Sequence, residues 1–143
     1  MASSPYLRQT LRANAHAVAA LLTEVEAWCA RHEVDARVAM HLSLMLDEWL
    51  TNIVEHGYQG KDGEIDVELS ASSVAHVDVV VRDQGRMFDP TRLAAPDIMV
   101  GIEEREIGGL GIHLIRRMAS HLTYARENET NVLRFGKSAD PRA

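Results

Sequence analysis

The spacing of apolar residues changes along this chain from a helical to a strand-like period, and this change limits the folds that it can form. From about residue 13 to residue 57, apolar side chains recur every three or four positions, as in helices with one buried face. Asn14 and Asp35 stand where the N-caps of two such helices would lie. Within 64–69 and 76–83, apolar and polar residues alternate, which is typical of half-buried strands. The two periods together predict helices packed against a sheet.

The expected elements form one layer of strands and one layer of helices. In chain order they are a strand over 7–11, helices over 13–32 and 36–57, strands over 64–69 and 76–83, a helix opening at 108–111, and strands over 122–126 and 132–135. Because the strands follow one another in pairs, the sheet should be mixed or antiparallel, with the helices on one face. We therefore expect an α/β (α+β) two-layer sandwich, formed as a single domain over residues 1–143.

Composition and charge argue against several classes of function. The chain has 15 basic and 21 acidic residues, a net charge of −6, which argues against direct binding of nucleic acid or of an anionic membrane. No apolar run approaches the roughly 20 residues that cross a bilayer, and the first residues do not resemble a signal peptide. The single cysteine, Cys29, excludes an internal disulfide and a cysteine-based metal cage. We expect a cytoplasmic protein.

Several residues imitate functional patterns without completing them. Gly136-Lys137-Ser138 resembles the end of a phosphate-binding P-loop, but Asn131 stands where the first glycine should be, and too few residues follow for the required helix. The seven histidines do not show the spacing of a motif such as His-Glu-x-x-His. We expect most of them to be surface or partly buried polar residues. Cys29 lies on an apolar helical stripe, where a catalytic thiol is not expected.

The first segment that points to chemistry contains Glu48 and Asn52. They are four residues apart and so share one face of a predicted helix, beside the apolar Leu44 and Trp49. One interpretation is an ordinary polar pair at the boundary of the core. The other is a site for metal and proton transfer, because an amide oxygen is a hard neutral ligand for Mg²⁺ and a carboxylate one turn earlier can take a proton from a hydroxyl.

Two further segments have a similar double interpretation. Asp83 ends a predicted strand and Gly85 follows two residues later. This pattern is either a simple turn or an adenine site. In an adenine site the carboxylate accepts a hydrogen bond from the base, and the glycine allows the base to approach the backbone closely. Gly108-Gly109-Leu110-Gly111 opens a predicted helix. Its glycines either permit a tight turn or free backbone N–H groups for phosphate.

Taken in order, the three segments resemble the sequence boxes of the GHKL ATPase superfamily. The residues that carry the resemblance are Glu48-x-x-x-Asn52 with His56-Gly57-Tyr58, Asp83-x-Gly85-x-x-Phe88-Asp89-Pro90, and Gly109-Leu110-Gly111. The short chain and the Phe-Asp-Pro triplet are similar to the anti-sigma factor serine-protein kinases of bacterial partner-switching systems. The resemblance extends from Leu7 to about Lys137.

This resemblance implies a Bergerat-type fold that binds ATP with Mg²⁺ under a lid. By motif match, Asn52 would be the Mg²⁺ ligand, and Glu48 would be the general base that accepts the proton of a partner serine. Asp83, with Gly85 beside it, would recognise adenine. The residues that would approach the phosphates are Gly109, Leu110 and Gly111.

The resemblance also implies partners. Such kinases phosphorylate a small STAS-type anti-sigma factor antagonist on serine, and otherwise sequester a sigma factor, commonly as a homodimer. Phosphorylation adds roughly −1.5 to −2 charges to the antagonist. The kinase is already acidic, so the added charge is expected to break the complex between the two proteins.

Three other interpretations stay open. The first is a non-catalytic, nucleotide-dependent module that binds a sigma factor or another regulator, which fits the acidic predicted lid (96–108, with Glu103, Glu104 and Glu106) and Met87 in the adenine segment. The second is the ATP-binding domain of a sensor histidine kinase, although no histidine-bearing dimerisation helices precede the boxes. The third is a structural protein in which the three motifs occur by accident.

Overall fold

The computed structural model describes residues 4–92 and 109–139. The elements in chain order are β1 (Tyr6–Arg12), α1 (Ala15–Arg31), α2 (Ala36–Asn52), a π-helical turn (Ile53–Gly57), β2 (Glu64–Ser73), β3 (His76–Asp83), a 3₁₀ turn (Pro90–Arg92), α3 (Gly109–Met118), β4 (His121–Glu127) and β5 (Thr130–Ser138). Each expected helix and strand is present, with ends shifted by a few residues.

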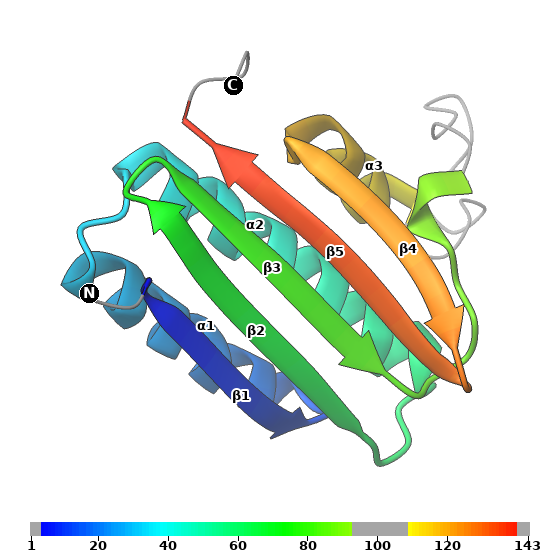
Figure 1. Cartoon of the computed structure of the whole chain (residues 1–143). Helices are drawn as coiled ribbons and strands as arrows, with labels where there is room; N and C mark the ends of the chain where they lie inside the picture. Colours follow the sequence, from blue (N-terminus) through cyan, green and yellow to red (C-terminus); the bar gives the residue numbers. More distant parts are fainter. Residues whose placement is uncertain (1–3, 93–108, 140–143) are drawn as a thin grey trace.

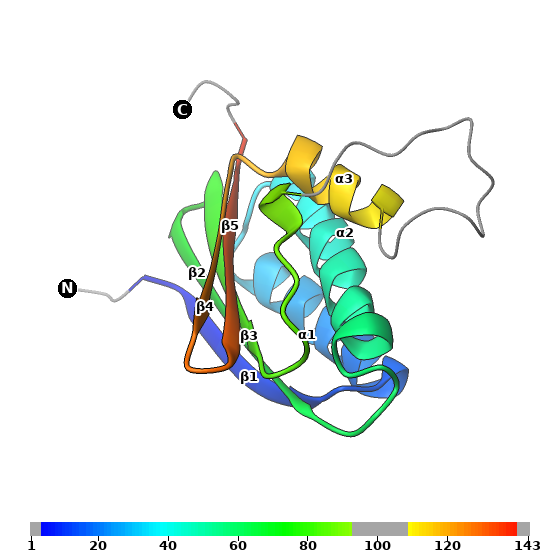
Figure 2. The same ribbon diagram turned by 90° about the vertical axis from the view of Figure 1, so that its right-hand side faces the viewer.

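The strands form a five-stranded sheet in the order β1-β2-β3-β5-β4, and every neighbouring pair is antiparallel. The helices cover one face of this sheet and leave the other face open (Figure 1; Figure 2). The predicted two-layer α+β sandwich is therefore confirmed, and the sheet is antiparallel throughout.

The core lies between the two layers. Alternation along β3 buries Val77, Val79 and Val81 on the helical side, as strand geometry requires. The apolar residues that recur at helical spacing along α2 and into the following turn are buried in the same core, and they are Val38, Leu42, Met45, Trp49 and Ile53. Burial of these apolar side chains in one core is the main favourable contribution to folding.

Local signals set where the two long helices begin. The Asn14 side-chain oxygen accepts a hydrogen bond from the N–H of Ala17 at 2.8 Å. Asp35 accepts from the N–H groups of Arg37 and Val38 at 2.9 and 3.1 Å. Each cap satisfies backbone donors that the first turn of a helix leaves unpaired, so both predicted caps are confirmed.

The end of α2 differs from a simple helix stop. Residues 53–57 form a π-helical turn, closed by a hydrogen bond from the N–H of Tyr58 to the carbonyl of Ile53 at 2.8 Å. The Tyr58 hydroxyl then donates to the carbonyl of Glu64 at 2.7 Å and accepts from the N–H of Gln84 at 2.8 Å. These bonds hold the end of α2 beside the end of β3, where the predicted site lies.

Within 4–92 and 109–139, none of the helices has the length and apolar character needed to cross a membrane.

Candidate functional site

Asn52 is the last residue of α2 and is buried. Its side-chain nitrogen Nδ2 is enclosed and has no hydrogen-bond partner among the described residues. A buried amide without a partner costs free energy, and proteins rarely leave one unpaired without a functional reason. Because the amide can be turned to present its oxygen, Asn52 fits the predicted role of a ligand for Mg²⁺.

Asp83 ends β3 and is also buried. Its oxygen Oδ1 accepts hydrogen bonds from the N–H of Gly85 at 2.9 Å and from Nδ2 of Asn131 at 3.0 Å. Burial raises the pKa of Asp83 above its ordinary value, although these two hydrogen bonds and the charge of Arg126 oppose the shift. No described residue donates a hydrogen bond to Oδ2, so this oxygen is the one that a ligand can use.

Two glycines let the ends of α2 and β3 touch through their backbones. The N–H of Arg86 donates to the carbonyl of Gly57 at 2.9 Å. A Cβ atom on Gly85 would lie 2.7 Å from the carbonyl carbon of Gly57 and 3.0 Å from Oδ1 of Asp83. No other residue type fits so close to a neighbouring backbone, so glycine at position 85 is required by this junction.

A small cavity joins Asn52 to the same junction. It has a volume of about 50 Å³ and is lined by Asn52, His56, Gly57, Arg86 and Phe88. This is room for a few water molecules and far less than the roughly 300–1,000 Å³ of a typical ligand pocket. A nucleotide seated here would therefore also occupy the adjoining surface. The predicted lid over 96–108, with the acidic residues noted above, lies outside the described residues.

Glu48 meets the start of α3. A Cβ atom on Gly111 would collide with the Glu48 carboxylate, so the second glycine of the predicted phosphate segment lies directly beside the predicted general base. Gly109 and Leu110 begin α3 on the same turn as Gly111, and α3 packs on α2. The structure thus brings together Glu48 and Gly111, which are 63 positions apart in the sequence.

Phe88 fastens the segment after β3 to α2. Its ring is tilted by 33° to that of Trp49, with the two centroids 6.2 Å apart. Asp89, next along the chain, accepts hydrogen bonds from the backbone N–H and hydroxyl of Thr91 at 2.9 and 2.6 Å. The Phe-Asp-Pro triplet therefore has a structural role, because it folds the segment back over the helix that carries Glu48 and Asn52.

Asn131 is a central residue of the site, although the sequence pattern left it between the two expected strands over 122–126 and 132–135. It is buried at the start of β5, and its Nδ2 donates to Asp83 as well as to the carbonyl of Arg86 at 3.1 Å. Its oxygen accepts from Arg126 at 2.9 Å, and Arg126 also donates to the carbonyl of Gly85 at 3.0 Å. The available signal was an asparagine at the start of an apolar strand, followed directly by Val132 and Leu133.

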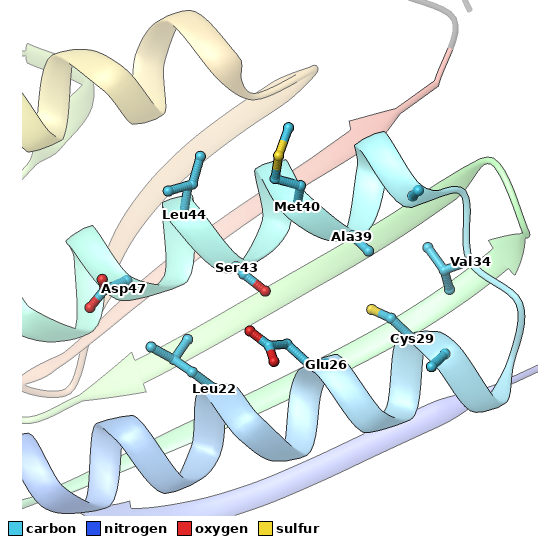
Figure 3. A pocket seen from close by; sticks show the side chains of 11 residues that line it. Leu22, Glu26, Cys29, Val34, Ala39, Met40, Ser43, Leu44 and Asp47 are labelled. Atoms are coloured by element: carbon cyan, nitrogen blue, oxygen red, sulfur yellow. The ribbon is translucent and has the colours of Figure 1, made fainter.

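A larger groove lies elsewhere, between α1 and α2. It has a volume of about 620 Å³, and none of the predicted site residues lines it. Figure 3 shows Glu26 of α1 and Ser43 of α2 pointing into this space. Cys29 lies at its floor, where burial raises the pKa of the thiol to about 11. Little thiolate forms at neutral pH with such a pKa, in keeping with the structural role expected for Cys29.

Residues 11–137 match the family described as the histidine kinase-like ATPase domain. The chain belongs to this family. It is also similar to the serine/threonine-protein kinase BtrW of Bordetella bronchiseptica, with 30% identity over 112 residues that cover 78% of each protein. Membership in the family implies that the chain binds ATP. The predicted resemblance to the GHKL-type, histidine kinase-like ATPases is confirmed, and the similarity to BtrW adds a serine/threonine kinase as a relative.

Two solved structures share the fold. The structure of the RsbU and RsbW domains of a Mycobacterium tuberculosis protein matches 96% of this chain with a TM-score of 0.67 and 19% identity. A blue-light activated histidine kinase from Erythrobacter litoralis matches 85% with a TM-score of 0.53 and 17% identity. The chain spans only 33% and 42% of the lengths of these two solved chains. At these identities the likeness concerns the fold alone.

Proposed function

We propose that this histidine kinase-like ATPase domain is an ATP-dependent serine-protein kinase that phosphorylates a STAS-type anti-sigma factor antagonist, and otherwise sequesters a sigma factor. The observation that carries the proposal is the meeting of three distant segments at one end of the sandwich. Glu48 lies against Gly111, and Asn52 shares a cavity with the Gly57–Arg86 junction beside Asp83. The similarity to BtrW, a named serine/threonine kinase, supports the same class of reaction.

Asp83 is proposed to select adenine. Its Oδ1 is held by Gly85 and Asn131, and Oδ2 would accept a hydrogen bond from the exocyclic amine of the base. Gly57 and Gly85, which both lie close to Oδ1 of Asp83, place no side chain of their own beside the carboxylate. Specificity of this kind is strong, because a base without the amine would leave a buried carboxylate oxygen unpaired.

Asn52 is proposed to hold Mg²⁺ through its amide oxygen. The residues present fit such an ion, since the amide nitrogen of Asn52 is buried without a partner among the described residues. Turned over, the amide offers a neutral oxygen that does not repel phosphate. When bound, Mg²⁺ neutralises charge on the nucleotide phosphates. The backbone N–H groups at the start of α3, at Gly109, Leu110 and Gly111, are proposed to bind those phosphates.

Glu48 is proposed to be the general base. The hydroxyl oxygen of the partner serine forms a bond to the γ-phosphorus while the bond from that phosphorus to the bridging oxygen breaks and ADP leaves. The proton of the hydroxyl passes to Glu48. The carboxylate is exposed on α2, so a partner protein can reach it, and its position beside Gly111 places it next to the proposed phosphate segment.

The experiment is phosphotransfer from labelled ATP to candidate STAS-domain antagonists. Glu48→Ala should lower the rate by roughly 10²–10⁴-fold, the usual contribution of a general base, and ATP binding should be kept. The matched control is Asp47→Asn, which changes the exposed neighbouring carboxylate on α2 and should leave the rate unchanged. A Glu48→Ala variant with the normal rate would show that the base assignment is wrong.

A non-catalytic binding module is the second candidate. It is favoured by Met87, a residue that is 65% exposed in the segment after β3 and offers an apolar contact for a partner. The same assay separates the two functions. ATP binding without label on a serine of any antagonist tested would favour the binding module over the kinase.

We further propose that the protein acts in the cytoplasm as a homodimer. β1 is an edge strand that pairs only with β2 among the described residues, and an unpaired strand edge is a ready surface for a second copy. Sedimentation equilibrium on the purified chain measures the mass directly. A monomer at all concentrations would exclude the dimer without affecting the kinase assignment.

A further inference from the structure

Three side chains converge on the open face of the sheet, at the end of β3 remote from Asp83. Nε2 of His76 lies 2.9 Å from Oδ1 of Asp78, and Nε2 of His121 lies 2.7 Å from the same oxygen. One potential ligand atom from each residue lies within 4.8 Å of the others. Figure 1 shows the starts of β3 and β4 at the same end of the sheet, with the end of β5 between them.

The register of the sheet builds this cluster. Asp78 and His121 are both paired with Gly136, from the two sides of β5, and His76 is paired with Ser138. A Cβ atom on Gly136 would lie 2.7 Å from Oδ1 of Asp78 and would collide with the His121 ring. The glycine therefore leaves an opening in the middle strand, over which side chains from two strands that are not neighbours can meet.

Ser138 fixes the direction of the His76 ring. Its hydroxyl lies 2.6 Å from Nδ1 of His76, which leaves Nε2 facing Asp78. Metal-binding histidines usually have their second ring nitrogen held by such a partner, which sets the tautomer and the orientation. The His76 and His121 rings also stack, with their centroids 6.1 Å apart, so both rings are held in similar planes.

We propose that His76, Asp78 and His121 form a binding site for a divalent transition-metal ion of the zinc type. Two imidazole nitrogens and one carboxylate oxygen are donors that suit Zn²⁺, whereas Mg²⁺ prefers oxygen alone. Tetrahedral zinc bonds of about 2.0–2.1 Å would require the nitrogen–oxygen separations to widen to about 3.3 Å, a shift within the reach of these partly exposed side chains. Three protein ligands leave the fourth position for water.

Metal at this site would connect β4 to β3 across β5. β4 is an edge strand, and its first residue, His121, follows closely after α3. A metal bridge would therefore stabilise the side of the sheet to which α3 is attached. This inference does not depend on the kinase proposal, because the proposed nucleotide site around Asp83 lies at the opposite end of β3 and shares no residue with the cluster.

The test uses metal-free protein, ZnCl₂ and a competing chromophoric chelator, with nucleotide left out because ATP itself binds Zn²⁺. One Zn²⁺ per chain is expected, with a rise in the unfolding temperature. His121→Ala and Asp78→Asn should each weaken binding at least about tenfold. His16→Ala, which removes an exposed histidine of α1, is the matched control and should bind like the unchanged protein. Equal Zn²⁺ affinity in all four proteins would overturn the proposal.

Gly136→Ala and cobalt give a second, independent readout. The alanine keeps all three ligands but fills the opening between them, so Zn²⁺ binding should fall while circular dichroism confirms the fold. Co²⁺ in the unchanged protein should give the visible absorption of a four-coordinate site with nitrogen and oxygen ligands. Absence of both Zn²⁺ and Co²⁺ binding would leave the cluster as a hydrogen-bonded group only, and would exclude the metal site.

Discussion

In the proposed adenine site, Asp83 has to be buried and still offer one oxygen as a hydrogen-bond acceptor. Its two hydrogen bonds use Oδ1, and an asparagine at this position would keep both of them. The isosteric change therefore separates the fold from recognition. At the scale of a single residue, the chemistry of one oxygen atom, Oδ2, distinguishes a role of Asp83 in adenine recognition from a purely structural role.

We predict that Asp83→Asn lowers ATP affinity strongly while leaving the protein at least as stable at neutral pH. Burial raises the folded-state pKa of Asp83 above its ordinary value of 3.8, so folding favours the protonated carboxyl. Its stabilising contribution is full below the unfolded pKa and is lost as the pH rises through the folded pKa. Asparagine does not titrate.

The check is urea unfolding of both proteins from about pH 4 to about pH 7. The unfolding free energy of the wild type minus that of Asp83→Asn should fall as the pH rises. A difference that grows with pH would contradict the raised pKa, and unchanged ATP affinity would contradict the adenine role.

At the scale of elements, α3 is placed so that a small residue faces the helix that carries the predicted base. We predict that Gly111→Ala preserves the fold but slows phosphotransfer by roughly a hundredfold, the effect of misplacing a reacting group by about 1 Å. The reason is that the added Cβ displaces the Glu48 carboxylate, the flexible end of a side chain, instead of moving a backbone.

A double-mutant cycle checks this mechanism. If Gly111→Ala acts through Glu48, adding it to Glu48→Ala should cause little further loss of rate. Fully additive losses would mean that the glycine acts elsewhere, for example through its backbone N–H on phosphate.

Local elements could be predicted from the sequence because their signals are local. Asn14 and Asp35 cap helices through backbone groups two or three residues away, and the alternation in β3 reports its own buried face. Asn131 could not be assigned in this way, because its partner Asp83 is 48 positions distant and only the pairing of β3 with β5 brings them together. The same holds for His76 and His121, whose spacing in the sequence contains no metal motif.

The resemblance to a family supplied what residue patterns alone left open. Glu48 and Asn52 are compatible with an ordinary polar pair, and the meeting of Glu48 with Gly111 appears only once α3 is packed on α2. The π-helical turn at 53–57 had no sequence signal that separates it from a normal helix end.

At the scale of the whole molecule, ligand binding and folding are linked. We predict that Mg²⁺ with ATP at 100 times the dissociation constant stabilises the wild type by about 2.7 kcal/mol. Asn52→Ala should lose the Mg²⁺-dependent part of this shift. Its stability without nucleotide should stay within about 1 kcal/mol of the wild type, because the cost of the space left behind is offset by removing an unpaired buried amide.

Thermal unfolding in ATP plus Mg²⁺, compared with unfolding in ATP plus a chelator, measures the Mg²⁺-dependent part of the stabilisation. Thr51→Ala changes the preceding, half-buried residue of α2 and serves as the control that should keep the full shift. A Mg²⁺-dependent shift that persists in Asn52→Ala would remove Asn52 from the metal site.

β3 carries the proposed adenine-binding carboxylate, Asp83, at its last residue and His76 of the proposed metal site at its first. Seven residue steps at about 3.3 Å put these two positions about 23 Å apart, well beyond the roughly 8 Å over which salt water transmits the influence of a charge. Ions arriving at the two ends would hardly sense each other electrostatically. The two ends of one strand would thus bind two different ligands, an energy-rich nucleotide and a trace metal ion, each without affecting the binding of the other.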